Sequence, residues 1–294
     1  MEALRNRKSN TNSSNLTADD IVKHFSSNPT NDNNYFNKDN DAIDTAINIL
    51  IEELDKPFDL AEFVNMIKSL VRNKSFGIDN IITDFFIDSC NFIAPFLVLL
   101  FNRNFETCDY PYECTKGIII PIFKKGDTDN PSDYRGITLI PYLAKIFSLC
   151  LRNRLHKYCE DENVFKDCQF GFRDKKSTVD CVFILYNFIQ KILASKTQLY
   201  CAFIDYQRCF DTVIHEALWQ KLVHLGISSK YINIVKSIYN RISSCIRYNS
   251  SELSALFDIA IGPKQGEPLS SLIFILFVND FATILILIVL LIMT

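Results

Sequence analysis

The sequence has no C-x-x-C pair, although it contains ten cysteines, scattered singly from Cys90 to Cys245. Paired cysteines are the usual mark of zinc sites and of redox-active thiols, so their absence argues against both. No secretory signal peptide follows Met1. We therefore expect a reduced intracellular protein, of the cytoplasm or the nucleus, with free and mostly buried thiols.

An excess of positive charge is also lacking, since the formal net charge is −3. An evenly basic coat for nucleic acid is thereby excluded. The charge is nevertheless uneven: residues 116–176 carry 12 Lys and Arg against 8 Asp and Glu, a net of +4. Such a segment suits a phosphate-binding surface, but an ordinary solvated face can carry the same charge.

Apolar runs long enough to span a membrane are lacking as well. Residues 284–294 are apolar except for the last, but spanning takes about 20 such residues. Extending the run back to Leu272 places Asn279 and Asp280 inside the span. A membrane or scaffold protein is thus supported by composition alone, and an uncovered apolar segment prone to aggregation is the better interpretation.

The first part of the chain shows polar and then helical patterns. Residues 1–40 are rich in Asn, Ser, Asp and Thr, which predicts disorder with one short helix around Asp19–Phe25. Apolar spacing predicts helices over Asp41–Leu54 and from Asp59 towards Gly77. Residues 82–107 predict an apolar helix pair broken near Pro95.

After residue 116 the pattern changes to short β-branched runs. They predict strands at 117–123, 134–139 and 199–204, of which the first and the last are expected to be buried. Helical spacing is found at 141–156, 179–193 and 211–225, where Gly226 ends the last helix. Helices and strands do not alternate in a regular βαβ repeat, so the expected fold class is α+β.

Asp205 is the first candidate for chemistry because it ends the predicted strand 199–204. A rigid, partly exposed carboxylate there suits a magnesium ligand. Asp211 would open the next helix as a cap or first-turn residue. Taken alone this pattern is weak, since a strand-end Asp is more often a cap or turn residue.

Five motifs in order carry far more information. Pro121-Ile122-Phe123-Lys124-Lys125-Gly126-Asp127 precedes Tyr134-Arg135-Gly136-Ile137-Thr138-Leu139, and Gln169-Phe170-Gly171-Phe172-Arg173 follows. Then come Phe203-Ile204-Asp205 with Phe210-Asp211, and finally Gly262-x-Lys264-Gln265-Gly266-x-Pro268-Leu269-Ser270. Over about residues 74–280 this series resembles the reverse transcriptase domain of LINE-like, non-LTR retrotransposons.

The resemblance implies the fingers and part of the palm of a right-hand polymerase, without a thumb. It divides the chain into a mostly disordered polar segment (1–40), a helical N-terminal extension (41–110), the fingers and partial palm (111–283) and an apolar tail unlike the family (284–294). The implied activity is two-metal phosphoryl transfer that adds deoxynucleotides, with Mg²⁺ as cofactor. The implied partners are an RNA template, a DNA primer and deoxynucleoside triphosphates.

The resemblance also assigns residue roles. Asp205 matches a catalytic, metal-binding carboxylate. Arg135 and Lys125, or its neighbour Lys124, match the grip on the triphosphate. Backbone at Tyr206 could hold phosphate oxygens, Phe210 crowds a ribose 2′-hydroxyl, and Gln265 with Gly266 lies beside the sugar and template pair. Gln169 and Arg173 would face template or primer.

Each role has a plainer alternative. Lys124-Lys125 could be a solvated turn, Phe210 a core aromatic, and Gln169 and Arg173 buried loop anchors. Glu267 stands where the family has a small or apolar residue and adds negative charge near the nucleotide.

No Asp-Asp pair follows Asp205, and one carboxylate cannot hold two divalent ions. We therefore expect little or no polymerase activity from this chain; a non-catalytic remnant that binds RNA or primer–template is the alternative.

Overall fold

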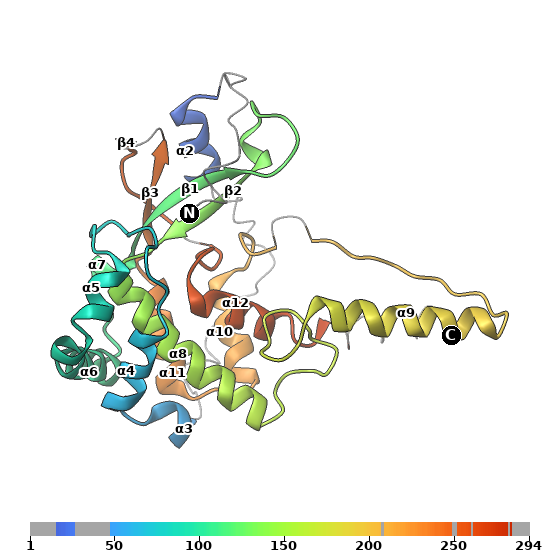
Figure 1. Cartoon of the computed structure of the whole chain (residues 1–294), viewed down its shortest axis with the longest axis horizontal. Helices are drawn as coiled ribbons and strands as arrows, with labels where there is room; N and C mark the ends of the chain where they lie inside the picture. Colours follow the sequence, from blue (N-terminus) through green and yellow to red (C-terminus); the bar gives the residue numbers. More distant parts are fainter. Residues whose placement is uncertain are drawn as a thin grey trace.

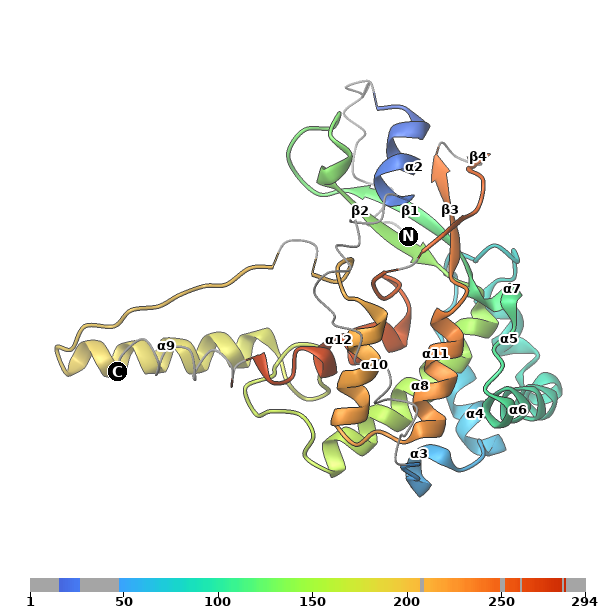
Figure 2. The ribbon, with the colours of Figure 1, turned by 180° about the vertical axis from the view of Figure 1, so that it is seen from behind.

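The computed structural model describes residues 16–26, 48–206, 209–248, 252–259, 261–281 and 283, which combine helices with one mixed sheet. A small twisted sheet lies above a cluster of helices, and helix α9 extends away from both (Figure 1). The view from behind shows the same arrangement (Figure 2). The apolar residues 284–294 lie outside the described residues.

The sheet has the strand order β2-β1-β3-β4, with β5 also paired to β3. Its strands are β1 (Lys116–Phe123), β2 (Tyr134–Leu139), β3 (Ser243–Tyr248), β4 (Glu252–Leu253) and β5 (Phe257–Asp258). The β1 and β2 strands are antiparallel, whereas β1 and β3 are parallel. The predicted strands 117–123 and 134–139 are thus confirmed.

Pro121 lies within β1 without breaking the sheet. Strand β3 pairs with β1 only from Lys116 to Ile119, so Pro121 lies past the end of that pairing. Proline lacks a backbone N–H and is tolerated where a strand edge needs no donor.

Helices both precede and follow strand β1 along the chain. Before the sheet lie α2 (Ala18–Ser26), α3 (Glu52–Asp55), α4 (Leu60–Lys68), α5 (Thr83–Asp88), α6 (Cys90–Thr107) and α7 (Tyr112–Thr115). After β1 come the 3₁₀ turn η2 (Pro131–Asp133), then α8 (Tyr142–Asp161), α9 (Thr178–Ala194), α10 (His215–His224), α11 (Ser229–Tyr239) and α12 (Pro268–Phe277).

An aromatic cluster forms the centre of the helical layer. The fully buried Phe147 of α8 lies with its ring centroid 4.8 Å from that of Phe101 and 5.8 Å from that of Phe58, and it stacks on Tyr110 at 5.6 Å. Aromatic pairs at such distances stabilise a core beyond their burial alone. Helix α8 therefore joins α4, α6 and the segment before α7.

One buried ion pair fixes the segment that precedes α4. The Arg154 side chain is only 5% exposed and donates to Glu62 at 2.9 and 2.8 Å. It also donates to the carbonyl oxygens of Lys56 and Pro57 and covers the Phe58 ring. Because the charge and its donors are satisfied, this guanidinium can be buried without a large desolvation penalty.

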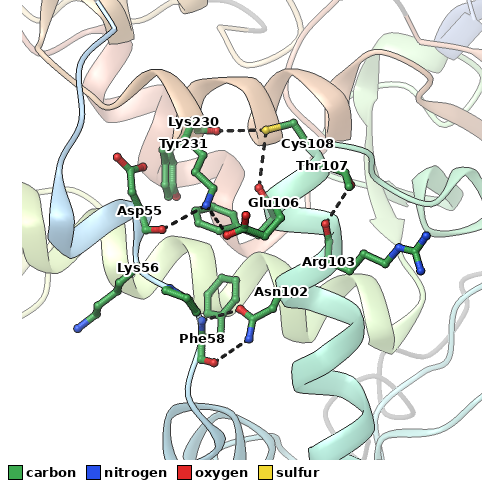
Figure 3. Close-up of polar contacts among 12 residues, drawn as sticks. Asp55, Lys56, Phe58, Asn102, Arg103, Glu106, Thr107, Cys108, Lys230 and Tyr231 are labelled. Carbon is green, nitrogen blue, oxygen red and sulfur yellow. Dashed lines mark hydrogen bonds and ion pairs between the residues drawn. The ribbon is translucent and has the colours of Figure 1, made fainter.

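A second set of polar contacts links the same segment to α6 and α11 (Figure 3). The Asn102 side chain accepts from the Phe58 amide at 2.7 Å and donates to its carbonyl at 2.9 Å. Lys230 donates to Glu106 at 2.8 Å and to the carbonyl oxygen of Asp55 at 3.4 Å. The segment 55–58 is therefore held from both sides.

The structure confirms several predicted helices and corrects others. The short helix near Asp19–Phe25 is present as α2, and α8 and α9 cover the predicted ranges. The helix predicted for 41–54 is wrong over 48–51, because only Glu52–Asp55 is helical; residues 41–47 lie outside the described residues. Helix α4 ends at Lys68, well before Gly77.

Two helix boundaries were also misplaced. The break in 82–107 falls at Ser89, and Pro95 lies inside α6. Helix α10 begins at His215 instead of Asp211, which lies in a turn. All ten cysteines are free, but only Cys90, Cys150, Cys159 and Cys245 are buried, so the expectation of mostly buried thiols is wrong.

The predicted buried strand 199–204 is not found. Residues 198–206 are extended but pair with no described strand, and Tyr200 and Phe203 are 87% and 85% exposed. None of the described residues of α9 is buried either. A β-branched and aromatic run becomes a buried strand only where a neighbouring strand and a covering layer meet it. Among the described helices, none is long and apolar enough to cross a membrane.

Candidate functional site

A cavity of about 300 Å³ lies between helix α2, strand β2 and the loops that precede α10 and α12. Four parts of the chain that are far apart in sequence line it. They contribute His24 and Phe25; Lys124, Ser132, Tyr134, Arg135 and Gly136; Tyr206, Cys209, Phe210 and Asp211; and Gln265.

A chain of hydrogen bonds crosses one wall of this cavity. The Arg135 Nε donates to the Gln265 side-chain oxygen at 3.1 Å, and the Gln265 amide nitrogen donates to an Asp211 carboxylate oxygen at 2.6 Å. The bonds orient the glutamine amide, since its oxygen and nitrogen each have a matching partner. The side chains of two motifs 130 residues apart are thus fixed relative to each other.

Backbone contacts hold the Gln265 loop against β2. The Thr138 amide donates to the Gln265 carbonyl at 2.7 Å. Gly266 has a φ of 114°, and a Cβ there would lie 2.6 Å from the Thr138 carbonyl oxygen. Only glycine tolerates both this conformation and this approach. Gly266 therefore shapes the loop and is not among the residues that line the cavity.

Aromatic rings form another wall. Phe210 stacks on Phe274 of α12 with centroids 4.1 Å apart, and its ring meets Phe172 edge-on at 6.1 Å. Tyr206 meets Phe281 edge-on at 5.4 Å. Phe210 is therefore packed from behind while it lines the cavity, so the core-aromatic and pocket interpretations both apply to it.

The two lysines after β1 are placed differently. Lys124 is exposed and lines the cavity, and its amide donates to the Asp133 carbonyl at 2.9 Å. Lys125 is exposed but is not among the lining residues. Asp133 also accepts from the Asp127 amide at 2.8 Å. The turn that carries both lysines is therefore ordered by Asp133.

Asp205 is exposed at the end of the extended segment and does not line the cavity. Within the described part of the chain, no group of three His, Cys, Asp or Glu side chains is placed to hold a metal ion. Divalent cations such as Mg²⁺ need several oxygen ligands around them. The described residues therefore do not fit a complete two-ion site.

Gln169 and Arg173 lie in the loop between α8 and α9. Arg173 donates to Glu160 at 2.9 and 2.7 Å and to the Lys166 carbonyl at 3.0 Å, and its side chain is mostly buried. The hydrogen bond from Arg173 lowers the pKa of Glu160. This geometry agrees with the loop-anchor interpretation of Arg173. Gln169 donates to the Gly171 carbonyl at 3.0 Å, and nucleic-acid contact by either residue stays a prediction.

Glu267 is not among the residues that line the cavity, and its proximity to a nucleotide stays a prediction. It is buried and accepts from Ser148 at 3.3 Å, Tyr239 at 3.0 Å and Ser270 at 2.9 Å. Three hydroxyl donors make a buried carboxylate tolerable. Nearby, the buried Lys264 donates to the Thr115 carbonyl, and burial lowers the pKa of Lys264 to about 8.

Several lining residues had no signal in the sequence. His24 and Phe25 belong to α2, about a hundred residues before the strands they face, and no motif includes them. Asp211 was expected to cap a helix but instead holds Gln265. Tyr134 opens the second motif but was given no role, and Ser132 lies two residues before that motif.

Comparison with known proteins identifies relatives of the chain. The family described as reverse transcriptase (RNA-dependent DNA polymerase) matches residues 122–291. The chain is 30% identical over 234 residues to a probable RNA-directed DNA polymerase from transposon BS of Drosophila melanogaster. The alignment covers 76% of this chain and 25% of the relative.

Two further relatives extend this likeness. Over 189 residues the chain is 30% identical to the RNA-directed DNA polymerase from mobile element jockey of Drosophila melanogaster. This alignment covers 64% of this chain and 20% of the relative. It is 25% identical over 236 residues to a transposon TX1 protein of Xenopus laevis, and this alignment covers 80% of this chain and 18% of the relative. The chain thus spans a quarter or less of the length of these relatives.

Proposed function

This chain belongs to the reverse transcriptase family, in the branch of non-LTR retrotransposons, and from that premise we propose that it binds deoxynucleoside triphosphates in the cavity beside β2. We assign the sheet with its turn to the fingers, and α9 to α12 with the Asp205 segment to part of the palm. The activity it serves is RNA-directed DNA synthesis on an RNA template from a DNA primer.

The observation that carries this proposal is the side-chain arrangement from Arg135 through Gln265 to Asp211. Arg135 and Lys124 place two cations on the lining of the cavity. A guanidinium held by one Nε bond keeps its remaining N–H groups free for phosphate oxygens. The neutral amide of Gln265, which is hydrogen-bonded to Arg135, suits the sugar next to the phosphates.

Phe210 supports the choice of deoxynucleotides. Its ring is fixed by Phe274 and Phe172 and cannot move back from the cavity without disturbing α12. A rigid ring beside the sugar would exclude a 2′-hydroxyl by contact. We expect Phe210→Ala to narrow the preference for dTTP over UTP.

Members of this family work with a divalent cation. We propose Asp205 as its ligand and Mg²⁺ as the ion, but the described residues place no second and third ligand beside Asp205. Oxygen ligands from outside the described residues would be needed to complete the site. We therefore propose that the described side chains bind nucleotides, and that adding them to a primer requires further oxygen ligands beside Asp205.

Nucleotide affinity tests the proposal directly. Fluorescence titration of the 294-residue chain with dTTP should give saturable binding, and Arg135→Ala should weaken it by roughly tenfold or more, as for a lost charge-assisted hydrogen bond. Arg103→Ala is the matched control, because Arg103 is an exposed arginine on α6, away from the cavity. Equal affinity of the Arg135 variant and the parent would contradict the nucleotide site.

A non-catalytic role in binding primer–template is the second candidate, and the isolated position of Asp205 favours it. Exposed cations, among them Lys124 and Lys125, Lys166, and Lys175 and Lys176, lie on the segment 116–176. Primer–template affinity should fall steeply with salt, because bound phosphates release counterions. Nucleotide addition in a primer-extension assay with Mg²⁺, lost in Asp205→Ala, would instead show that this chain is a complete polymerase.

A further inference from the structure

Helix α2 reaches the cavity from the N-terminal part of the chain. It lies beside β1 and β2 in both views (Figures 1 and 2), and its residues His24 and Phe25 line the cavity together with Arg135. The family match begins only at residue 122, so α2 is outside it. One wall of the cavity is therefore formed by residues that lie outside the family match.

Local sequence explains why α2 forms. Thr17 and Asp20 make reciprocal bonds: the Asp20 amide donates to the Thr17 hydroxyl at 3.2 Å, and the Thr17 amide donates to the Asp20 carboxylate at 3.0 Å. The Thr17 hydroxyl, which donates to the Asp20 carboxylate at 2.6 Å, and the Thr17 amide lower the pKa of Asp20. This arrangement satisfies amides that a helix N-terminus otherwise leaves without partners.

Packing on β2 explains why α2 lies at the cavity. A Cβ on Gly136 would come within 2.8 Å of the Phe25 ring and within 2.9 Å of the Ile119 side chain. Phe25 therefore occupies the space that a side chain at position 136 would need. Since Arg135 is the neighbouring residue, the contact sets α2 next to the proposed phosphate grip.

The end of α2 adds a nitrogen-bearing side chain to those that already line the cavity. Its last turn carries Lys23 and His24. His24, Lys124 and Arg135 come from three separate segments and line one cavity. The Asp211 carboxylate in the same cavity already accepts from Gln265. Three nitrogen-bearing side chains around one space fit a ligand with several anionic oxygens, such as a triphosphate.

We propose that α2 is the outer wall of the nucleotide pocket, that the His24 side chain donates a hydrogen bond to the phosphates of a bound deoxynucleoside triphosphate, and that Phe25 seated on Gly136 holds it there. This inference rests on the proposed nucleotide site. It makes residues 18–26 part of the substrate-binding surface and not a plug that competes with substrate.

The test compares dTTP with dTMP on the 294-residue chain in EDTA, so that protein side chains alone hold the phosphates. His24→Ala should weaken dTTP binding roughly fivefold, the order of one hydrogen bond, and dTMP binding less than twofold. Lys23→Ala is the control, since it removes a cation from the same turn without removing a lining residue. His24→Gln keeps an N–H donor and should restore most of the dTTP affinity.

Phe25→Ala gives an independent measurement, because it should undock α2 and weaken dTTP binding at least as much as His24→Ala. Unchanged or tighter dTTP binding by the His24 and Phe25 variants would overturn the proposal; tighter binding would identify α2 as a plug. Equal losses for dTTP and dTMP would overturn the phosphate contact. If Arg135→Ala weakens dTTP binding while His24→Ala does not, only the α2 inference fails; if neither does, the nucleotide site fails with it.

Discussion

Helices α8 and α9 are neighbours in the sequence and both carry large apolar side chains, yet the structure treats them in opposite ways. Helix α8 buries Phe147, Leu151 and Leu155 against α4 and α12. Helix α9 leaves Val182, Phe183 and Tyr186 on the surface, 59–66% exposed. Apolar composition therefore does not decide burial by itself. A partner helix in the right place decides it.

The exposed side chains of α9 continue along the extended segment that follows. Tyr200, Phe203, Ile204 and Tyr206 are also exposed, so residues 178–206 form one apolar hairpin that projects from the molecule. Contiguous apolar surface of this kind is rare on isolated soluble proteins and marks a face that pairs or aggregates. Equivalent substitutions in the packed region around α8 and in this hairpin should therefore have different effects.

Two phenylalanines should show the largest difference. Phe147→Ala removes a fully buried ring in contact with three others and should lower the free energy of unfolding by about 3–5 kcal/mol. Phe183→Ala in the hairpin should change it by less than about 0.5 kcal/mol. Urea denaturation followed by circular dichroism measures both. Similar losses for the two variants would show that α9 is packed in solution.

Lysines in the two regions should differ in their pH dependence. Burial holds the pKa of Lys264 at about 8, below its ordinary value of 10.5. The unfolded chain therefore binds more protons than the folded chain between pH 8 and 10.5, and stability due to this group rises across that window. The shift corresponds to a change on the order of 3 kcal/mol.

Lys264→Met should remove this rise. The difference in free energy of unfolding between the parent and the variant should move in favour of the parent as pH increases from 8 to 10.5. Lys191→Met removes an exposed lysine from α9 and controls for the loss of one positive charge. Chemical denaturation at a series of pH values gives the comparison, and parallel curves for parent and Lys264→Met would contradict a buried charged lysine.

Helix caps give the smallest and most selective comparison. Asp59 caps α4 by accepting from the Glu62 amide at 2.7 Å, and Ser177 caps α9 by accepting from the Asp180 amide at 3.1 Å. Asp59→Ala should cost about 1 kcal/mol of global stability. Ser177→Ala should leave global stability unchanged and speed amide hydrogen exchange within α9 alone. Loss of global stability in the Ser177 variant would contradict a separate hairpin.

Local patterns in the sequence were enough for elements that depend on local patterns. Strands β1 and β2 are β-branched runs around a turn, and the Ser177 cap marks the start of α9. The buried strand at 199–204 failed because burial depends on neighbours that no local window contains. Strand β3 escaped prediction since its pairing with β1 joins residues more than 120 apart.

The residues of the candidate site likewise include some that the sequence motifs predicted and others that they did not. Motif order led to Lys124, Arg135, Phe210 and Gln265, and the structure places these four around one cavity. The partner role of Asp211 could not be foreseen, because its position at the start of a helical pattern suggested a cap. The contribution of α2 could not be foreseen either, since a Thr-x-x-Asp cap predicts a helix but not where that helix docks.

The parallel pairing of β1 with β3 has a consequence for how the protein is made. Lys116 leaves the ribosome before its partner Ser243, and at about 5–20 residues per second the gap lasts roughly ten seconds. During that time the β1–β2 hairpin has an open edge formed by Gly117, Ile118 and Ile119. Nascent chains with such an edge are prone to mispair with one another. Chaperone dependence during translation is therefore expected to be set by this one strand pairing.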